Sequence, residues 1–287
     1  MVKDKSHRRT TGQNIRPGVD GGPIRLIQVS DTHLFASPEG LMVGMKSDEG
    51  FQAVIESIRQ QQKHIDIVVC TGDISQDASV SSYLRFDQTI SSLGAPHLWI
   101  PGNHDALDNI RQAIGTDSCG LDKRQRLANW ELLMLDTCVE GMIHGHLSEA
   151  ELMFLDRHLE QQTQRADIPP VVICLHHNPL PVKARWLQKH ALQNSEEFLA
   201  ILDKYTHVKC VLWGHIHQEF DEVRKGVRML ASPSTCVQFH PENNLFALDD
   251  QNPGYRWLDL FPDGHLQTGV VRVSDRTFDI DFSSVGY

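Results

Sequence analysis

The chain has no apolar run approaching the roughly 18 residues that a membrane-spanning helix needs. Its first 22 residues are polar, basic and glycine-rich, and they lack the apolar stretch of a secretory signal. Such a segment has little to bury, so we expect residues 1–22 to be a disordered N-terminal tail. No linker divides the remainder, and we expect residues 23–287 to form a single domain in the cytoplasm, without membrane contact.

The chain has few cysteines and fewer basic than acidic residues. The six cysteines show no paired spacing, and three of them fall in apolar runs where cysteine acts as a small hydrophobe. We therefore favour free thiols in a reducing compartment over a disulfide framework. The 27 Lys and Arg residues against 37 Asp and Glu give a net charge of −10, which argues against a stable nucleic-acid partner.

Strand-like and helix-like patterns alternate along most of the chain. Near-continuous β-branched runs are typical of strands buried on both faces, and they occur at 24–30, 65–70, 97–100, 171–175 and 208–213. Helices are predicted between them by the apolar stripe at 51–58, by the capping box of Ser148 and Glu151, and at 195–202. This alternation predicts an α/β fold with a largely parallel sheet. The end of the chain differs, since 228–231, 255–260 and 269–273 predict an antiparallel or mixed portion.

Each of the five strand-like runs leads into residues that can bind a metal ion. In open α/β sheets, sites gather outside the carboxyl ends of strands, so these loops can converge. Oxygen and imidazole donors suit Fe, Mn, Zn or Co, and the lack of cysteine in the motifs excludes a cysteine-based zinc site. The donors that could form two metal sites are Asp31, His33, Asp73, Asn103, His176 (or its neighbour His177), His215 and His217.

Two metal ions need a carboxylate that holds them together, and Asp73 is the candidate because it lies between the other donors in the chain. A pair of ions about 3.5–4 Å apart can stabilise both the attacking and the leaving oxygen of a displacement at phosphorus. The sequence thus predicts a metal-dependent hydrolase. Histidines outside the motifs are expected to be surface or packing residues: His7, His64, His97, His144, His146, His158, His190, His207 and His240.

The ordered motifs resemble the signature of the calcineurin-like metallophosphoesterase superfamily, over roughly residues 24–280. The resemblance implies an α/β fold built as a sandwich of two mixed β-sheets flanked by helices. It implies that one ion is held by Asp31, His33, Asp73 and His217. A second ion would be held by Asp73, Asn103, His176 and His215.

The same resemblance assigns catalytic roles to two neighbouring residues. His104 would polarise the phosphoryl group or protonate the leaving oxygen, and Asp105 would orient His104 through a hydrogen bond. Aligning on Pro179 favours His176 over His177 as the ligand, and His177 would then pack or bind substrate. The residues implied to contact substrate are His33, Asp73, Asn103, His104 and His217.

Stretches at 176–187, 214–219, 232–239 and 253–257 resemble the bacterial class III 3',5'-cyclic AMP phosphodiesterases. This narrower resemblance implies hydrolysis of cyclic AMP to 5'-AMP with two divalent ions, Fe²⁺ or Mn²⁺, with Zn²⁺ or Co²⁺ as alternatives. Two other functions stay open: a phosphodiesterase that also takes 2',3'-cyclic nucleotides or glycerophosphodiesters, and a non-catalytic binding scaffold. The sequence does not separate a monomer from a homodimer. Candidate walls for the purine, or else simple packing aromatics, are Phe35, Trp186 and Phe239.

Overall fold

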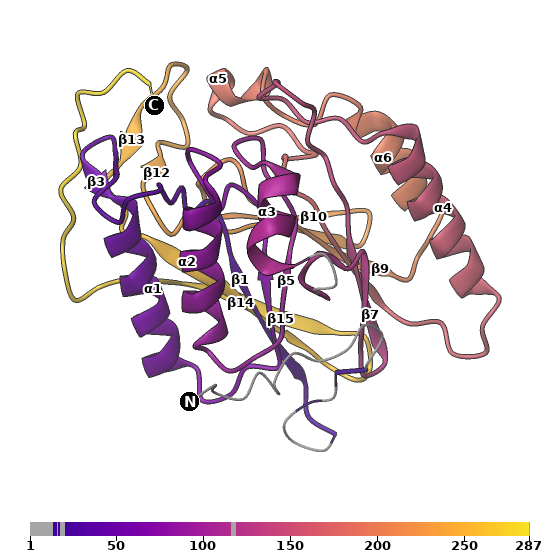
Figure 1. Cartoon of the computed structure of the whole chain (residues 1–287). Coiled ribbons are helices and arrows are strands. Elements are labelled where there is room, and N and C mark those ends of the chain that lie inside the picture. Colours follow the sequence, from indigo (N-terminus) through magenta and orange to yellow (C-terminus); the bar gives the residue numbers. More distant parts are fainter. Residues whose placement is uncertain (1–13, 16, 18–20, 116–118, 287) are drawn as a thin grey trace.

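Two β-sheets lie face to face at the centre of the computed structural model, with helices on both outer sides (Figure 1). The structure describes residues 14–15, 17, 21–115 and 119–286. The first sheet has the strand order β15-β14-β1-β4-β5. Strands β1, β4 and β5 are parallel to one another, whereas β14 runs antiparallel to both β1 and β15. The strands are β1 (Ile24–Val29), β4 (Ile67–Cys70), β5 (His97–Trp99), β14 (Gly254–Leu260) and β15 (Leu266–Arg272).

The second sheet has the order β10-β11-β9-β8-β7-β6. Its four inner strands are parallel, and each edge strand is antiparallel to its neighbour, so this sheet is also mixed. The strands are β6 (Arg124–Leu127), β7 (Trp130–Met134), β8 (Val171–Cys174), β9 (Val208–Trp213), β10 (Phe220–Arg224) and β11 (Val227–Ala231).

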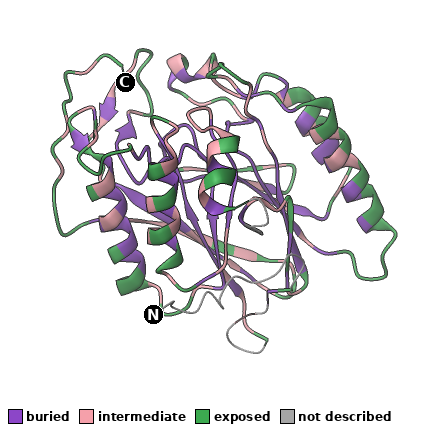
Figure 2. Ribbon diagram, in the orientation of Figure 1, coloured by how far each residue is buried: buried purple, intermediate pink, exposed green. Residues whose placement is uncertain are grey.

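Helices cover the outer face of each sheet and bury one side only, as the colouring of Figure 2 shows. The first sheet is covered by α1 (Ser47–Gln61), α2 (Val80–Ser91) and α3 (Leu107–Ile114), and the second by α4 (Glu149–Thr163) and α6 (Ser195–Leu202). Smaller elements are the hairpin strands β2 (Leu41–Met42) and β3 (Met45–Lys46), the short helix α5 (Arg185–Gln188), the 3-10 turn Cys119–Leu121, and the strands β12 (Gln238–Phe239) and β13 (Leu248–Asp249).

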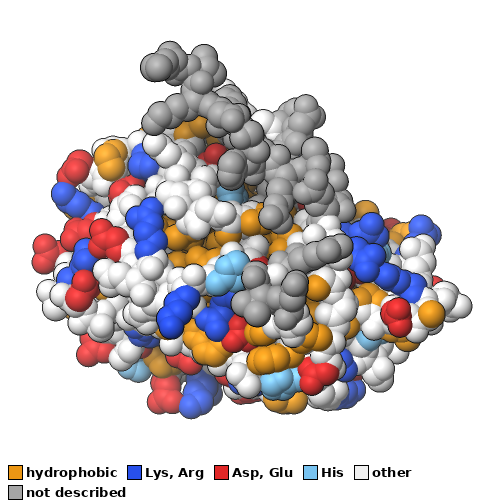
Figure 3. All heavy atoms as spheres, turned by 90° about the horizontal axis from the view of Figure 1, so that it is seen from below, with side chains coloured by type: hydrophobic (Ala, Val, Ile, Leu, Met, Phe, Trp, Pro, Cys, Tyr) orange, Lys and Arg blue, Asp and Glu red, His pale blue; other side chains and the backbone are white. Residues whose placement is uncertain are grey.

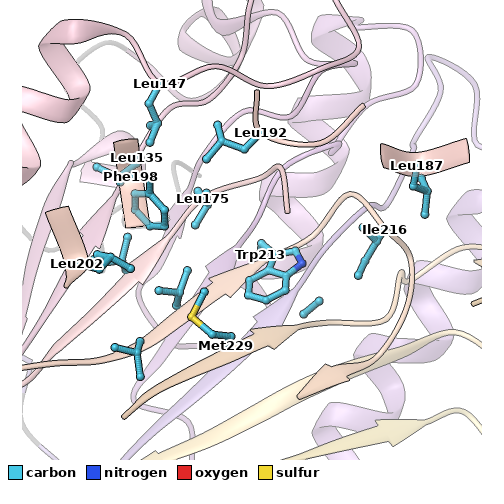
Figure 4. Close-up of a cluster of buried hydrophobic side chains, with 14 of the residues drawn as sticks. Leu135, Leu147, Leu175, Leu187, Leu192, Phe198, Leu202, Trp213, Ile216 and Met229 are labelled. Carbon is cyan, nitrogen blue, oxygen red and sulfur yellow. The ribbon is translucent and has the colours of Figure 1, made fainter. Parts of the chain in front are cut away.

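Apolar side chains alternate between the layers because successive residues of a strand point to opposite faces. On β1, Leu26 packs between the sheets with Leu212, whereas Ile27 and Val29 face the helices. A further cluster joins the second sheet to its helices, with Phe198 of α6 near Leu202 and Trp213 of β9 in Figure 4. Each such fully buried side chain contributes about 1.5–3 kcal/mol relative to an exposed one. The strand ends that carry the predicted ligands are therefore firmly held.

Several sequence-based expectations are confirmed, and one is corrected. Helices cover the predicted stripe at 51–58 and the segment 195–202, and Ser148 Oγ accepts a hydrogen bond from the Glu151 backbone N–H at 3.2 Å. The antiparallel portion near the C-terminus is present as β14 and β15. The sandwich of two mixed sheets that the resemblance implied is confirmed, whereas the largely parallel sheet inferred from the alternation is divided between these two sheets. The patterns did not reveal α2, α3, β6, β7 or β10.

Most of the predicted N-terminal tail lies outside the described residues. Ile15 is described and is buried, where its backbone N–H donates to the Arg126 carbonyl at 3.0 Å. The five cysteines whose side chains are described are free, and the side chain of Cys119 lies outside the described part. None of the helices in the described ranges combines the length and apolar character that a membrane crossing needs.

Candidate metal centre

The loops that follow β1, β4, β5, β8 and β9 meet at one end of the sandwich. Predicted ligands from the two sheets lie close together there. His176 Nε2 lies 3.3 Å from Asp73 Oδ2, and the Nε2 atoms of His33 and His217 are 3.0 Å apart. The opposite end, seen in Figure 3, instead shows charged side chains of both signs among hydrophobic ones.

The backbone at this end adopts an uncommon conformation. A positive φ in a residue other than glycine costs roughly 1–2 kcal/mol and persists only where the surrounding structure holds it. It is found at five of the seven predicted ligands, with φ of 54° at Asp31, 47° at His33, 49° at Asp73, 67° at His215 and 48° at His217. The fold thus keeps strain at the point where the donors converge.

Glycines let these loops approach each other closely. A Cβ on Gly102 would overlap the Asp73 carboxylate, and one on Gly214 would overlap Ser30 Oγ. At Gly72, where φ is +93°, a Cβ would lie 2.5 Å from His176 Nδ1. These glycines beside the donor residues therefore allow the loops to approach closely.

Three imidazoles are oriented by carbonyl oxygens behind them. The Nδ1 atom of His33 lies 2.6 Å from Gln76 Oε1, that of His176 lies 2.7 Å from the Thr71 carbonyl, and that of His217 lies 2.8 Å from the Val237 carbonyl. A carbonyl oxygen only accepts, so each Nδ1 carries a proton, which leaves Nε2 as the ring nitrogen that can bind a metal ion. Such outer partners fix the tautomer of metal-binding histidines.

The histidine Nε2 atoms that face the centre have few hydrogen-bond donors around them. The Nε2 atoms of His33 and His217 face each other as two acceptors. The buried Nε2 of His215 has no hydrogen-bond partner among the described residues. An unsatisfied buried acceptor is costly, and a cation would satisfy it. The donor set therefore fits metal ions.

Asp73 lies between two groups of donors. Its Oδ2 atom is 3.3 Å from His176 Nε2 and 3.8 Å from His33 Nε2. On the His176 side, Asn103 Oδ1 lies 3.3 Å from His176 Nε2. On the other side, Asp31, His33 and His217 offer ligand atoms that all lie within 4.8 Å of one another. This placement is what a bridging carboxylate requires.

Burial and mutual charge shift the titration of these groups. Burial raises the pKa of Asp31 to about 7 and lowers the pKa of His33 to about 4. Burial opposes ionisation of Asp73 too, but the charges of the surrounding histidines, His176 foremost, and the hydrogen bond with His176 together outweigh burial and hold the pKa of Asp73 well below its usual range. Burial likewise disfavours protonated His176, yet Asp73 raises the pKa of His176 to about 9. Asp73 thus needs a positive charge beside it, whether from a proton or from a metal ion.

The two adjacent histidines after β8 have different surroundings. His177 places Nδ1 2.7 Å from Thr137 Oγ1 and Nε2 3.0 Å from the Ile143 carbonyl. Both its nitrogens therefore have protein partners, although its ring also lies close to His176 and His215. This arrangement favours His176 as the ligand.

His104 and Asp105 lie on the loop after β5. The His104 ring is 5.1 Å from the His33 ring, and its backbone N–H donates to Asp73 Oδ1 at 2.9 Å. Direct orientation of the His104 ring by Asp105 stays a prediction. The contacts of Asp105 give it a further role, because it joins the loop after β5 to the loop after β4. Its carboxylate accepts hydrogen bonds from the N–H groups of Gly102, Ile74 and Ser75 and from the Tyr83 hydroxyl.

Sequence patterns did not reveal Gln76 or the supporting role of segment 232–239. In that segment, Ser234 Oγ donates to the Asp31 carbonyl at 2.7 Å, and the Phe239 ring stacks on His217 with centroids 4.0 Å apart. Phe239 is fully buried, so it supports a predicted ligand rather than lining the site. The one local signal for Gln76 is its position three residues after Asp73.

Comparison with known proteins agrees with this geometry. The family model described as calcineurin-like phosphoesterase matches residues 24–219. The 3',5'-cyclic adenosine monophosphate phosphodiesterase CpdA of Escherichia coli K12 is 42% identical, over 92% of this chain and 95% of its own. The protein of the same name from Pseudomonas aeruginosa is 39% identical, over 94% and 97%. A 3',5'-cyclic-nucleotide phosphodiesterase of Nostoc is 36% identical, over 88% and 93%.

Solved structures confirm the predicted fold class. A dimetal phosphatase from Danio rerio aligns with a TM-score of 0.63 at 15% identity, over 88% of this chain and all of that one. A purple acid phosphatase from yellow lupin aligns with a TM-score of 0.61 at 16% identity, over 89% of this chain and 52% of that one. On its sequence matches, its fold and its ordered donors, the chain belongs to the calcineurin-like phosphoesterase family.

Proposed function

We propose that this chain hydrolyses 3',5'-cyclic AMP to 5'-AMP, using two divalent ions of Fe²⁺ or Mn²⁺. One observation carries the proposal: Asp73 lies between two groups of buried donors whose imidazole nitrogens turn their lone pairs inward. The names of the relatives, which match over nearly their whole length, supply the substrate. We also propose that the enzyme acts in the cytoplasm and that residues 23–287 form one domain.

The seven donors divide into two sets that share Asp73. We assign Asp31, His33, Asp73 and His217 to the first ion. We assign Asp73, Asn103, His176 and His215 to the second. The ions would supply positive charge to the phosphoryl oxygens and make an attacking water more acidic.

The proton on the leaving oxygen is the task that we assign to His104. Opening the cyclic diester to 5'-AMP breaks the bond between phosphorus and the 3' oxygen, which must gain a proton as it leaves. His104 is only partly buried and lies against His33, so its ring is available at the edge of the centre. Its backbone bond to Asp73 fixes its distance from the donors. The residues that we propose to contact the substrate phosphate are His33, Asp73, Asn103, His104 and His217.

The test is hydrolysis of two isomers by purified, metal-replete protein. We expect 3',5'-cyclic AMP to be cleaved, with 5'-AMP as the product. Protein carrying Asp73→Ala serves as the control for a contaminating activity. Cleavage of 2',3'-cyclic AMP alone, or formation of 3'-AMP, would contradict the proposed substrate while leaving the family assignment intact.

A further inference from the structure

The loop of residues 137–147 carries two large apolar side chains that are exposed at its tip. Met142 is 48% exposed and Ile143 is 54% exposed. The tip is a tight turn in which the Met142 N–H donates to the Val139 carbonyl at 3.0 Å, and Gly141 has a φ of +71°. Single exposed apolar residues need no explanation, but an adjacent pair beside a buried polar centre suggests contact with a ligand.

His177 fixes this tip next to the metal centre. Its Nε2–H donates to the Ile143 carbonyl, which leaves Nδ1 to accept from the Thr137 hydroxyl. One histidine therefore holds both the start and the tip of the loop. The His177 ring lies 4.8 Å from the His176 ring and 4.7 Å from the His215 ring. Ile143 is thus separated by one side chain from two proposed ligands of the second ion.

The other side of the loop is fixed by the segment after α5. The Gly145 carbonyl accepts from the Gln193 N–H at 2.9 Å, and the Asn194 side chain bonds both the N–H and the carbonyl of Leu147. A Cβ on Gly145 would overlap the His177 ring, so the loop also lies in close contact with the residue that holds its tip. The tip is therefore exposed but firmly placed, and little ordering cost remains for a ligand that binds there.

Two of the three aromatic residues that were candidate walls for the purine pack against other side chains. Phe239 is fully buried against His217. Trp186 packs edge-on against Phe239 and Phe246, with ring centroids 5.1 and 5.3 Å apart. A base that extends from a phosphate bound at the metal centre needs an accessible apolar surface close by, and the loop tip offers one.

We infer that Met142 and Ile143 form the base-binding wall of the active site, and that His177 is the positioning residue that holds this wall beside the metal centre. The inference rests on the proposed cyclic AMP phosphodiesterase activity. It assigns base contact to a loop that supplies no metal ligand, so base binding and phosphate chemistry should be separable.

The decisive experiment compares cyclic AMP with ribose 3',5'-cyclic phosphate, which has the same cyclic diester but no base. In the double variant Met142→Ser and Ile143→Ser, we expect KM for cyclic AMP to rise about tenfold or more, with kcat little changed, because apolar contacts of this size give such discrimination. Kinetic constants for the base-free diester should stay within about twofold of wild type. Val223→Ser is the matched control, since Val223 is 68% exposed on the edge strand β10.

Thr137→Val tests the positioning role without altering the tip. It removes the hydroxyl that bonds His177 and nearly preserves side-chain volume, so we expect a smaller rise in KM for cyclic AMP and an unchanged metal content. The same KM for cyclic AMP in the double variant and in wild type would overturn the inference. So would equal losses on both substrates, which would place the loop in support of the metal centre. If the wild-type enzyme cleaved only the base-free diester, the proposed cyclic AMP phosphodiesterase activity would be contradicted. The inference, which rests on that activity, would then fail as well.

Discussion

Two clusters of buried histidines lie in the described part of the chain, and they differ in where their ring nitrogens point. In the metal centre, the Nε2 atoms of His33 and His217 face each other. In the second cluster, between α4 and β7, hydrogen bonds close within the cluster. There, His158 Nε2 lies 3.2 Å from Glu131 Oε2, and His207 Nε2 lies 3.0 Å from Gln162 Oε1. Buried histidines alone therefore do not make a metal site, since the direction in which their ring nitrogens point decides.

The two histidine clusters also differ in backbone conformation. The metal centre occupies loop residues with positive φ, whereas Glu131, His158 and Gln162 lie on a regular strand and helix. Strain is retained where function needs a special geometry, and it is avoided where packing suffices. We therefore expect changes in the first cluster to affect metal binding and activity, and changes in the second to affect folding stability alone.

The largest effect is expected from Asp73→Ala. Removing the shared carboxylate should lower activity by more than about 10³-fold, beyond the 10–100-fold typical of outer partners, and should deplete both ions. Elemental analysis together with a hydrolysis assay measures this. Asn103→Ala is the comparison, because it should weaken only the second position. Unchanged metal content in Asp73→Ala would show that Asp73 is not the bridge.

Next in size is His104→Ala, which should keep both ions and lose activity on the order of 10²–10⁴-fold. The loss should be smaller for a nitrophenyl phosphodiester, whose leaving group departs without a proton. Rates on both substrates, with metal content as the control, give the answer. Equal losses on the two substrates would assign His104 to positioning or charge stabilisation instead of proton donation.

A smaller change is expected from Gln76→Leu, which removes the acceptor behind His33 Nδ1. Affinity at the first position should fall about 10–100-fold, while the second position is retained, because such partners orient the ring and raise its basicity. Titration of the metal-free protein with Mn²⁺ resolves the two steps. Gln76→Glu supplies an acceptor again and should restore binding. Equal weakening of both positions would argue for general damage to the centre.

The smallest effect on activity is expected from Glu131→Gln in the second cluster. Burial would raise the pKa of Glu131, but the hydrogen bond and charge of His158 hold it below its ordinary value of 4.5. A carboxylate with a depressed pKa stabilises the fold above that value, and the contribution is lost as pH falls through the folded-state pKa. The variant should unfold about 1–3 kcal/mol more easily at pH 7.5 and lose less on acidification below pH 4.5 than wild type does.

Urea unfolding of chelator-treated protein at both pH values checks this prediction. Burial also lowers the pKa of His207, so protonation below its ordinary value of 6.5 acts in the same direction in both proteins. The charge of Glu131 opposes that lowering, so the difference between variant and wild type reports Glu131 together with its effect on His207. A steeper acid dependence in the variant, or a loss of bound metal, would contradict the separation of the two clusters.

The donors were predictable because their motifs follow apolar runs in the sequence, and those runs form the strands that end at the centre. The groups that orient these donors could not be predicted from the sequence. Val237 and Thr71 contribute backbone carbonyls to His217 and His176, and the latter pair is 105 residues apart in sequence. The position of a backbone carbonyl depends on how the two sheets pack, and every residue has one, so residue type does not show which carbonyl will accept. The base-binding loop was missed for the same reason, since only contact with His177 places Ile143 at the centre.

Metal content tests the central claim most directly: that the inward-facing nitrogens and Asp73 hold two ions. Elemental analysis of protein purified without chelator should give close to two transition-metal ions per chain, with Fe or Mn prominent, and the same value for His158→Gln. Chelation should abolish hydrolysis, and added Mn²⁺ should restore it. A chain without bound metal, whose activity is unaffected by chelators, would contradict the account.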